Sequence, residues 1–431
     1  MFPRAKYRKI QIRMIPPSTL LFFCLSAIFS GSLVQTIMSP SVSYVIIIVI
    51  GCICLAQNAY RLSRRGVNRK GCYYLIIIIW LFLCSVVYPH EIINQLMRVC
   101  TISISFYISE KYSARGILKA FVVFSICIAI VALVGHYLQE NTEALSALPR
   151  VQNLNEVSYR FGLIYNYIEI VPERICGFFW EPGLLGTCMI IAFLVYVIEF
   201  VQSFGLREIL VCAILMICCF STRSSASYAL GALCIMALLL NKSSAKLRTG
   251  FEIVRFTLFL VVIFIIVNID SIIQLTPYAN EYEFLKLTSS GIRESNRMMA
   301  VLENSKLWVK NPIFGAGLTN AIENGKVVVA DTSTSTFLMA AYGIGGIVYS
   351  IAILHGVFTQ RHWNIYLKVL VCTIVIAIVN KEPHFTNVFS WILIFILLSE
   401  SSSQFTQNEG FSISDNYRER GEKMGRGEAG I

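Results

Sequence analysis

Long apolar stretches make up most of this chain, and they limit it to one kind of fold. Runs such as Tyr44–Ile50 and Leu75–Leu83 belong to stretches long enough to cross a bilayer, which takes about 20 apolar residues in a helix. Only 14% of the 431 residues are charged, against about a quarter in a typical soluble domain. The sequence therefore predicts an all-α, polytopic integral membrane protein, because a β-barrel would show short alternating segments instead.

About twelve transmembrane helices are expected, with both termini in the cytoplasm. Every connection assigned to the inner side carries at least one lysine or arginine, and basic residues crowd the connection 61–71, as the positive-inside rule requires. The run 19–38 is long for a signal peptide and lacks a clear cleavage site, so it is taken as the first span. The predicted spans are 19–38, 42–60, 72–89, 96–110, 117–138, 182–201, 207–221, 226–241, 256–274, 334–358, 365–380 and 386–400.

Two long connections, 139–181 and 275–331, fall on the outer, periplasmic side. The other connections are short, so residues 1–400 are interpreted as a single integral membrane domain, and the Ser-, Gly- and Glu-rich residues 401–431 as a disordered cytoplasmic tail. The net charge of +11 does not indicate nucleic-acid binding, because the basic residues lie mainly at the ends of apolar segments. Nearly all of the 14 cysteines fall inside apolar runs, so no disulfide framework, metal site or cofactor is expected.

The first outer loop ends in the segment Pro172–Gly183, whose sequence is PERICGFFWEPG. Glu181 stands where a membrane helix begins, and proline follows it in the first helical turn, a favoured place for proline. The helix dipole alone can account for a carboxylate at this position. The alternative is that Glu181 transfers protons, with a pKa raised by desolvation, beside aromatic rings such as Trp180 that can stack on a sugar.

The second outer loop contains a helical segment, 292–310, which Asn311 and Pro312 bring to an end. One face of this segment carries two arginines four residues apart, which can bind one polyanion together. The asparagine amide and the tryptophan indole on the same face suit a sugar. A solvated amphipathic helix is the alternative. The glycines of Phe314–Gly317 allow backbone amides to approach a ligand or a neighbouring helix. At about 100° per residue, the polar face collects Arg293, Arg297, Asn304 and Trp308.

Two short outer turns carry further ionisable residues. Arg223 lies between two apolar spans, where an arginine is costly unless it pairs, binds a ligand or extends to the interface. Glu382 and His384 follow span 365–380 and could transfer protons, although a lone surface histidine is usually only solvated.

Three pieces of the sequence together resemble the O-antigen polymerase and ligase superfamily of bacterial inner-membrane glycan enzymes. They are Arg174 with GFFWEPG (177–183), STRSS (221–225) and SNRMMAVLENSKLWVKNPIFGAGL (295–318). The number of spans and the long outer loops also match the family. The ligase branch typically carries His-Asn just after the second outer loop, where this chain reads DTSTST (331–336). The resemblance therefore favours the polymerase over the ligase.

The resemblance implies a glycosyltransferase that joins oligosaccharide repeat units on undecaprenyl diphosphate at the periplasmic face of the inner membrane. The product would be an O-antigen, a capsule or an exopolysaccharide, and a chain-length regulator and a flippase would be partners. Arginines suit the diphosphate because their planar fork binds phosphate oxygens bidentately. A metal-independent reaction is expected, since the outer loops contain no Asp-x-Asp. The resemblance leaves the base unassigned. The candidate catalytic residues are Glu181 and His384, and the candidate substrate-binding residues are Arg174, Arg223, Arg293, Arg297, Asn304, Trp308 and Trp180.

Two other classes of function remain open at this point. A lipid-linked glycan flippase or other transporter would have a similar number of spans, but transporters usually place polar residues in broken helices near the midplane. Here the charges collect in the outer loops and at the ends of spans. A sensor or assembly scaffold would use the outer loops only for binding.

Overall fold

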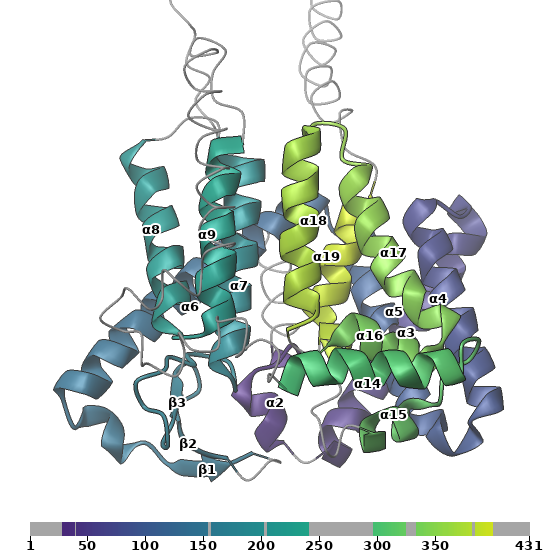
Figure 1. Cartoon of the computed structure of the whole chain (residues 1–431), viewed down its shortest axis with the longest axis horizontal. Coiled ribbons are helices and arrows are strands. Elements are labelled where there is room, and N and C mark those ends of the chain that lie inside the picture. The colour runs from purple at the N-terminus through teal and green to yellow at the C-terminus, as the bar shows by residue number, and fades with distance from the viewer. Residues whose placement is uncertain are drawn as a thin grey trace, which may run out of the picture.

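The structure is a computed structural model that describes residues 28–38, 40–153, 157–201, 205–240, 296–324, 333–381 and 384–399. Most of these residues form a helical bundle (Figure 1). Among the described residues, five segments are long and apolar enough to cross a membrane, namely α3 (Pro40–Arg65), α4 (Arg69–Val87), α5 (Ile92–Lys111, with the preceding turn from Pro89), α6 (Ala114–Asn141) and α7 (Pro182–Val195, continued by a π-helical turn to Phe200). Shorter apolar helices complete the bundle: α9 (Ser225–Leu240), α17 (Ile344–Phe358), α18 (Ile365–Val379) and α19 (Val388–Leu398).

Most of the predicted spans within the described residues coincide with helices. The two short spans, 96–110 and 207–221, are the helices α5 and α8 (Leu206–Ser221). The predicted span 256–274, residues 19–27 of span 19–38 and the predicted tail 401–431 lie outside the described residues. The described part is therefore a mostly helical, membrane-type chain.

The predicted span 334–358 is two helices, α16 (Thr334–Tyr342) and α17, separated at Gly343. Gly343 has a φ of 58°, and a Cβ there would lie 2.1 Å from the carbonyl oxygen of Ile313. Glycine is required by this close approach and by the positive φ, and apolarity alone could not reveal the break. Within span 19–38 the described end is likewise not one continuous helix, because Ser32 caps a short separate helix, α2 (Leu33–Ile37).

The connection 139–181 contains a small antiparallel sheet that the all-α prediction did not include. Its strands are β1 (Arg150–Gln152), β2 (Ser158–Phe161) and β3 (Asn166–Ile168), in the order β1-β2-β3. Tyr159 pairs with Val151 on one side and with Ile168 on the other. Its ring is buried in a small apolar cluster that includes Leu33 and Cys176. The sheet is thereby attached to α2 and to the segment that leads into α7.

The bundle has two distinct ends. At one end, Lys70 forms an ion pair of 2.7 Å with Glu110, and His362 lies 3.2 Å from Glu199. The opposite end carries the sheet, α14 (Asn296–Lys310) and α15 (Leu318–Asn324), as Figure 1 shows. Connections that the sequence assigns to one side of the membrane thus lie at one end of the bundle; we call the end with the sheet and α14 the loop end.

The core consists of two apolar clusters that share α19. One cluster lies among α6, α7, α8, α9 and α18, and the other among α4, α5, α16 and α17. Ile392 of α19 belongs to the first cluster, and the adjacent Trp391 belongs to the second. The turn that precedes α19 at the loop end therefore lies between the two halves of the bundle.

Candidate functional site

Three connections that are far apart in the sequence meet at the loop end, around the first turn of α7. The Nζ of Lys381, between α18 and α19, donates a hydrogen bond of 3.3 Å to the carbonyl oxygen of Gly183 in α7. The Nε of Arg174 donates a hydrogen bond of 3.3 Å to the carbonyl oxygen of Thr222, between α8 and α9. Lys381 is only 3% exposed. Two cationic side chains, from two different connections, therefore lie around one helix start, and the third connection supplies the carbonyl oxygen of Thr222.

Glu181 is the residue that begins α7, as the sequence predicts. Its extended backbone, with a φ of −136°, is that of an N-cap, and Pro182 occupies the first turn. The carbonyl oxygen of Glu181 accepts hydrogen bonds from the amides of Leu184 (3.2 Å) and Leu185 (3.4 Å). The half-buried side chain makes no capping hydrogen bond to α7, whose residues are all described. The carboxylate is therefore not committed to holding the start of this helix.

Trp180 is held beside Glu181 through its backbone. Its amide donates to the carbonyl oxygen of Gly31 at 3.2 Å, and its carbonyl oxygen accepts from the hydroxyl of Tyr159 at 2.8 Å. The loop sheet and the segment before α2 thus fix the position of the aromatic residue next to the carboxylate.

Arg223 has a left-handed backbone, with a φ of 46°, and is exposed. Such a conformation costs a non-glycine residue about 1 kcal/mol or more and persists only where the surroundings impose it. Here the buried hydroxyl of Thr222 donates to the carbonyl oxygen of Cys219 at 2.7 Å and contacts Ser227 at 3.3 Å. Directly behind this turn, a Cβ at Gly186 would lie 2.2 Å from the Ser227 hydroxyl, so α7 and α9 approach closely. The packing therefore imposes the backbone that presents Arg223 to the outside.

His384 is buried, unlike the solvated histidine that is usual in a surface turn. Its backbone amide donates to the hydroxyl of Thr334 at 3.0 Å, and its Nδ1 lies 3.3 Å from the hydroxyl of Ser390. Its Nε2 is buried without a hydrogen bond among the described residues. Burial and then the positive charge of Lys381, partly opposed by the carbonyl of Ile378, lower the pKa of His384 to about 4. The imidazole is therefore neutral at neutral pH.

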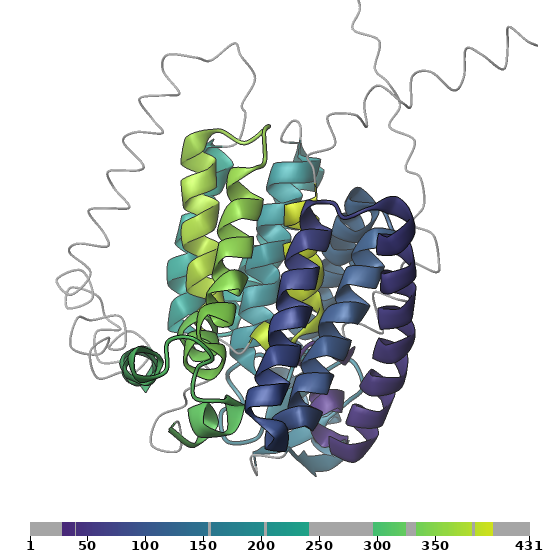
Figure 2. The ribbon, with the colours of Figure 1, turned by 90° about the vertical axis from the view of Figure 1, so that its right-hand side faces the viewer.

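The polar face of α14 does not lie as the sequence suggests. Asn304 is completely buried, and its Nδ2 donates to the hydroxyl of Thr336 in α16 at 3.3 Å. Leu302 and Val309, which fall roughly opposite the polar face, are 45% and 71% exposed. α14 lies across the end of the bundle, and Figure 2 shows it end-on beside the other helices. An exposed apolar side on a helix in this orientation is typical of a helix in the membrane interface.

The remaining predicted residues are placed less completely. Trp308 is half-buried, and its Nε1 donates to the carbonyl oxygen of Pro312 at 3.3 Å. Arg297 is in the first turn of α14, and its side chain lies outside the described residues. Arg293 and Glu382 lie wholly outside them. The structure therefore places Arg174, Glu181 and Trp180 near the start of α7, with Arg223 exposed in the turn that Arg174 contacts, and it adds Lys381 and the nearby His384.

The Gly-x-Gly turn after α14 binds a neighbouring helix, one of the two possibilities that its sequence leaves open. The amides of Ala316 and Gly317 donate to the carbonyl oxygens of Ala340 (2.8 Å) and Ala341 (3.2 Å) in α16. The hydroxyl of Tyr88 donates to the carbonyl oxygen of Gly315 at 2.6 Å. These contacts fix α14 and α15 on the bundle.

Glu91 is a structural residue that the sequence interpretation missed. Its carboxylate is 1% exposed and accepts hydrogen bonds from the amides of Leu318 (2.9 Å) and Thr319 (2.7 Å) at the start of α15. Gln95 donates a further bond of 3.2 Å. The sequence feature that could have identified Glu91 is its position as an acidic residue in the tight turn between two apolar spans.

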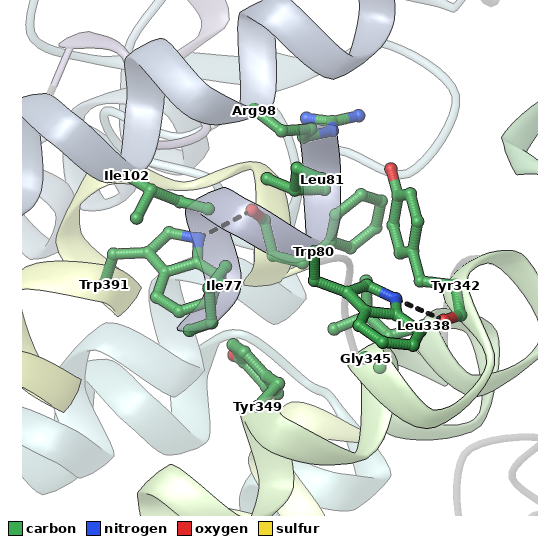
Figure 3. Close-up of a pocket in the computed structure, with 12 residues that line it drawn as sticks. Ile77, Trp80, Leu81, Arg98, Ile102, Leu338, Tyr342, Gly345, Tyr349 and Trp391 are labelled. Carbon is green, nitrogen blue, oxygen red and sulfur yellow. Dashed lines mark hydrogen bonds between the residues drawn. The ribbon is translucent and has the colours of Figure 1, made fainter. Parts of the chain in front are cut away.

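Arg98 and Lys381 were also missed, although Arg98 lies inside a predicted span and Lys381 directly follows one. Arg98, in α5, places its guanidinium carbon 4.6 Å from the centre of the Phe385 ring. It lines a pocket of about 40 Å³, drawn in Figure 3. The signal for Arg98 was an arginine inside the predicted span 96–110, where ionisable residues are rare and usually functional.

Comparisons of the chain with protein-family models, curated proteins and solved structures found no match. A functional assignment therefore depends on the geometry of the loop end and on the sequence motifs. That geometry joins several cations, a carboxylate and a neutral imidazole at a helix start, a combination suited to binding an anion and moving a proton beside it.

Proposed function

We propose that this protein is a membrane glycosyltransferase that polymerises oligosaccharide repeat units carried on undecaprenyl diphosphate. The observation that carries the proposal is the placement of Arg174 and Lys381 around the first turn of α7, which Glu181 begins, with Arg223 exposed in the adjoining turn. A lipid diphosphate is held near the membrane surface by its chain, so the groups that bind it must lie at the ends of spans. The reaction is assigned to the periplasmic face of a bacterial inner membrane, with both termini in the cytoplasm.

The cations would act on the leaving group. As the bond between the anomeric carbon and the diphosphate oxygen breaks, negative charge grows on the diphosphate, and nearby guanidinium and ammonium groups stabilise it. The hydroxyl of the acceptor sugar attacks the anomeric carbon and loses its proton to a base. The products are a lengthened glycan on one lipid and a free polyprenyl diphosphate.

Glu181 is the better base in this scheme. Its half-buried carboxylate makes no capping bond to α7, and it lies on the chain next to Trp180, which can stack on a sugar. His384 is a second possibility, because its buried Nε2 has no hydrogen bond among the described residues. With a pKa of about 4 it is a weak base unless a bound anion raises that pKa.

The decisive experiment uses purified protein in liposomes with purified lipid-linked repeat units, analysed for glycan length on gels. A polymerase converts single units into a ladder without partners. Movement of units across the membrane without lengthening would instead identify a flippase. Binding with neither effect would identify a sensor or scaffold.

The arginines give a more specific prediction. We expect Arg174→Ala and Arg297→Ala to lower polymer formation by roughly 10²–10³-fold, the usual cost of losing one contact to developing charge. Lysine replacements should restore only part of the activity, because they lack the bidentate fork. Arg150→Ala is the control: this side chain is 64% exposed and paired with Glu169, a contact worth little at a surface. Equal, mild losses at all three positions would exclude a specific diphosphate site.

A further inference from the structure

A pocket of about 40 Å³ lies in the second half of the bundle, among α4, α5, α16, α17 and α19. It is separate from the cations around α7, and the turn that carries His384 and Phe385 lies between the two regions. The proposed glycosyl transfer makes no use of it. Figure 3 labels five of its main side chains, Trp80, Arg98, Tyr342, Tyr349 and Trp391. Phe385 also lines the pocket.

Three polar groups of this pocket are buried without hydrogen bonds among the described residues. They are the Nε of Arg98 and the hydroxyls of Tyr342 and Tyr349. The Arg98 guanidinium and the Tyr342 hydroxyl are close enough to interact with each other, and the Glu91 carboxylate acts on Tyr342 from a greater distance. Burying a polar group without a partner is costly, most of all when it belongs to a charged side chain. The guanidinium can only donate, and both hydroxyls can donate. A ligand that satisfies all three must offer several acceptor oxygens, and the guanidinium favours one with a negative charge.

The walls of the pocket are apolar and fixed. The Nε1 atoms of Trp80 and Trp391 donate to the carbonyl oxygens of Tyr342 and Phe385, both at 2.9 Å, so neither indole N–H is available to a ligand. The ring of Trp80 also stacks on Phe314, with centroids 5.4 Å apart. Recognition of a polar ligand therefore depends on Arg98 and the two tyrosine hydroxyls.

The size of the pocket and its depth in the bundle limit further which ligands it can bind. One water needs roughly 10–15 Å³ of cavity, so about 40 Å³ suits a few heavy atoms, and a sugar ring is too large. Arg98 is six residues into α5, about 9 Å along the helix from its loop end, a depth near the lipid headgroups. On α4, Ile76 and Ile79 beside the pocket are about half exposed and form an apolar surface suited to a lipid chain.

We propose that the Arg98 pocket binds the phosphate of a singly phosphorylated membrane lipid. Arg98 supplies the positive charge, and the hydroxyls of Tyr342 and Tyr349 donate to the remaining phosphate oxygens. The lipid chain lies outside the pocket, along the exposed apolar residues of α4. This lipid site is distinct from the proposed diphosphate site and does not depend on the glycan chemistry.

The test is native mass spectrometry of the purified protein in detergent with three probes. These are dioleoyl phosphatidic acid, dioleoylglycerol with the same chains, and inorganic phosphate. We expect one phosphatidic acid bound per protein, no comparable binding of the other two probes, and a roughly ten- to hundredfold loss of affinity in Arg98→Gln. Arg98→Lys should recover part of the binding. Arg115→Gln, an exposed arginine at the opposite end of the bundle, should bind as the unaltered protein does.

Tyr342→Phe keeps the test valid if Arg98→Gln does not fold, since it removes one donor and almost no volume. A several-fold loss of phosphatidic acid binding is expected for it. Equal binding by the unaltered protein and by these variants would overturn the proposal and leave a pocket that holds only water. Arg98-dependent binding of inorganic phosphate as tight as that of phosphatidic acid would overturn the lipid assignment. Because no glycan is formed or measured, the outcome is independent of whether the protein polymerises repeat units.

Discussion

His384 is the residue whose chemistry depends most on its surroundings. Burial and the charge of Lys381 hold it neutral, and its Nδ1 is engaged by Ser390. It therefore contributes a dry, uncharged imidazole next to a buried ammonium group. Such a ring senses an incoming anion, because a negative charge nearby would favour its protonated form.

The pKa of His384 predicts a pH dependence of stability. The folded pKa of about 4 lies below the ordinary value of 6.5, so below pH 6.5 the unfolded chain takes up a proton that the folded protein does not. This contribution to stability is therefore complete above pH 6.5 and is lost as the pH falls towards 4, to a total of about 3 kcal/mol. Melting temperatures in detergent between pH 7.5 and 4.5 should fall less steeply for His384→Gln than for the unaltered protein. Parallel curves would show that burial does not hold the ring neutral.

Glu181 provides the second prediction at this scale. If its carboxylate accepts the proton of the acceptor hydroxyl, Glu181→Gln should abolish long glycan without changing protein abundance. Glu173→Gln, a half-buried glutamate in the same connection, is the matched control and should retain polymer. His384→Ala is the companion variant for the alternative base. Near-normal polymer in Glu181→Gln would reduce Glu181 to a residue that starts α7.

At the scale of elements, the loop end is fixed by close contacts between backbone and side chains. Gly317 has a φ of 85°, and a Cβ there would lie 2.8 Å from a carboxylate oxygen of Glu91. The same carboxylate receives the first amides of α15. The position of α14 and α15 therefore depends on the space that Gly317 leaves for the Glu91 carboxylate.

Gly317→Ala should release α15 from the bundle, because the new methyl group displaces the Glu91 carboxylate and leaves two amides without an acceptor. The loss of buried hydrogen bonds should cost about 1–3 kcal/mol. We expect a lower melting temperature and faster hydrogen exchange at residues 315–319. Gly66→Ala is the matched control, since Gly66 also has a positive φ (76°) but nothing lies within 4 Å of its Cβ position. If both variants lose the same stability, backbone strain explains the effect and the contact with Glu91 does not.

The elements also show what the sequence can and cannot predict. Apolar length identified the bundle helices, and Asn311 with Pro312 correctly ended α14, because these signals are local. The buried side of α14 was not predicted, since Asn304 finds its partner, Thr336, in another helix. The break at Gly343 and the loop sheet depend in the same way on contacts between distant segments. Arg174 and Glu181 were identifiable from motifs, whereas Lys381 gained importance only through its contact with Gly183.

At the scale of the whole molecule, the two ends of the bundle carry different chemistry. One end joins its helices through ion pairs such as Lys70 with Glu110, and the other gathers Arg174, Lys381 and His384 around the start of α7. α19 contributes residues to both core clusters. A ligand bound at the turn between α18 and α19 would therefore lie where the two halves of the bundle meet.

This arrangement predicts which end faces outward. On a background without native cysteines, Val67→Cys should be protected from an impermeant thiol reagent in intact cells, and Asn320→Cys should be labelled. Both positions are exposed in the structure, so burial does not limit the reaction. Labelling at position 67 but not at position 320 would reverse the predicted orientation and remove the periplasmic reaction with it.

During synthesis of this protein, Glu91 is made well before the residues that donate hydrogen bonds to it. Leu318, which donates to its carboxylate, follows it by 227 residues. At the usual rate of translation, roughly 5–20 residues per second, the wait is roughly 10–45 s. During that time the newly inserted α4–α5 hairpin carries a carboxylate that has Gln95 as a donor but lacks the two amide donors of α15. A ribosome that stalls before residue 318 thus leaves a product whose Glu91 carboxylate lacks both amide donors of α15.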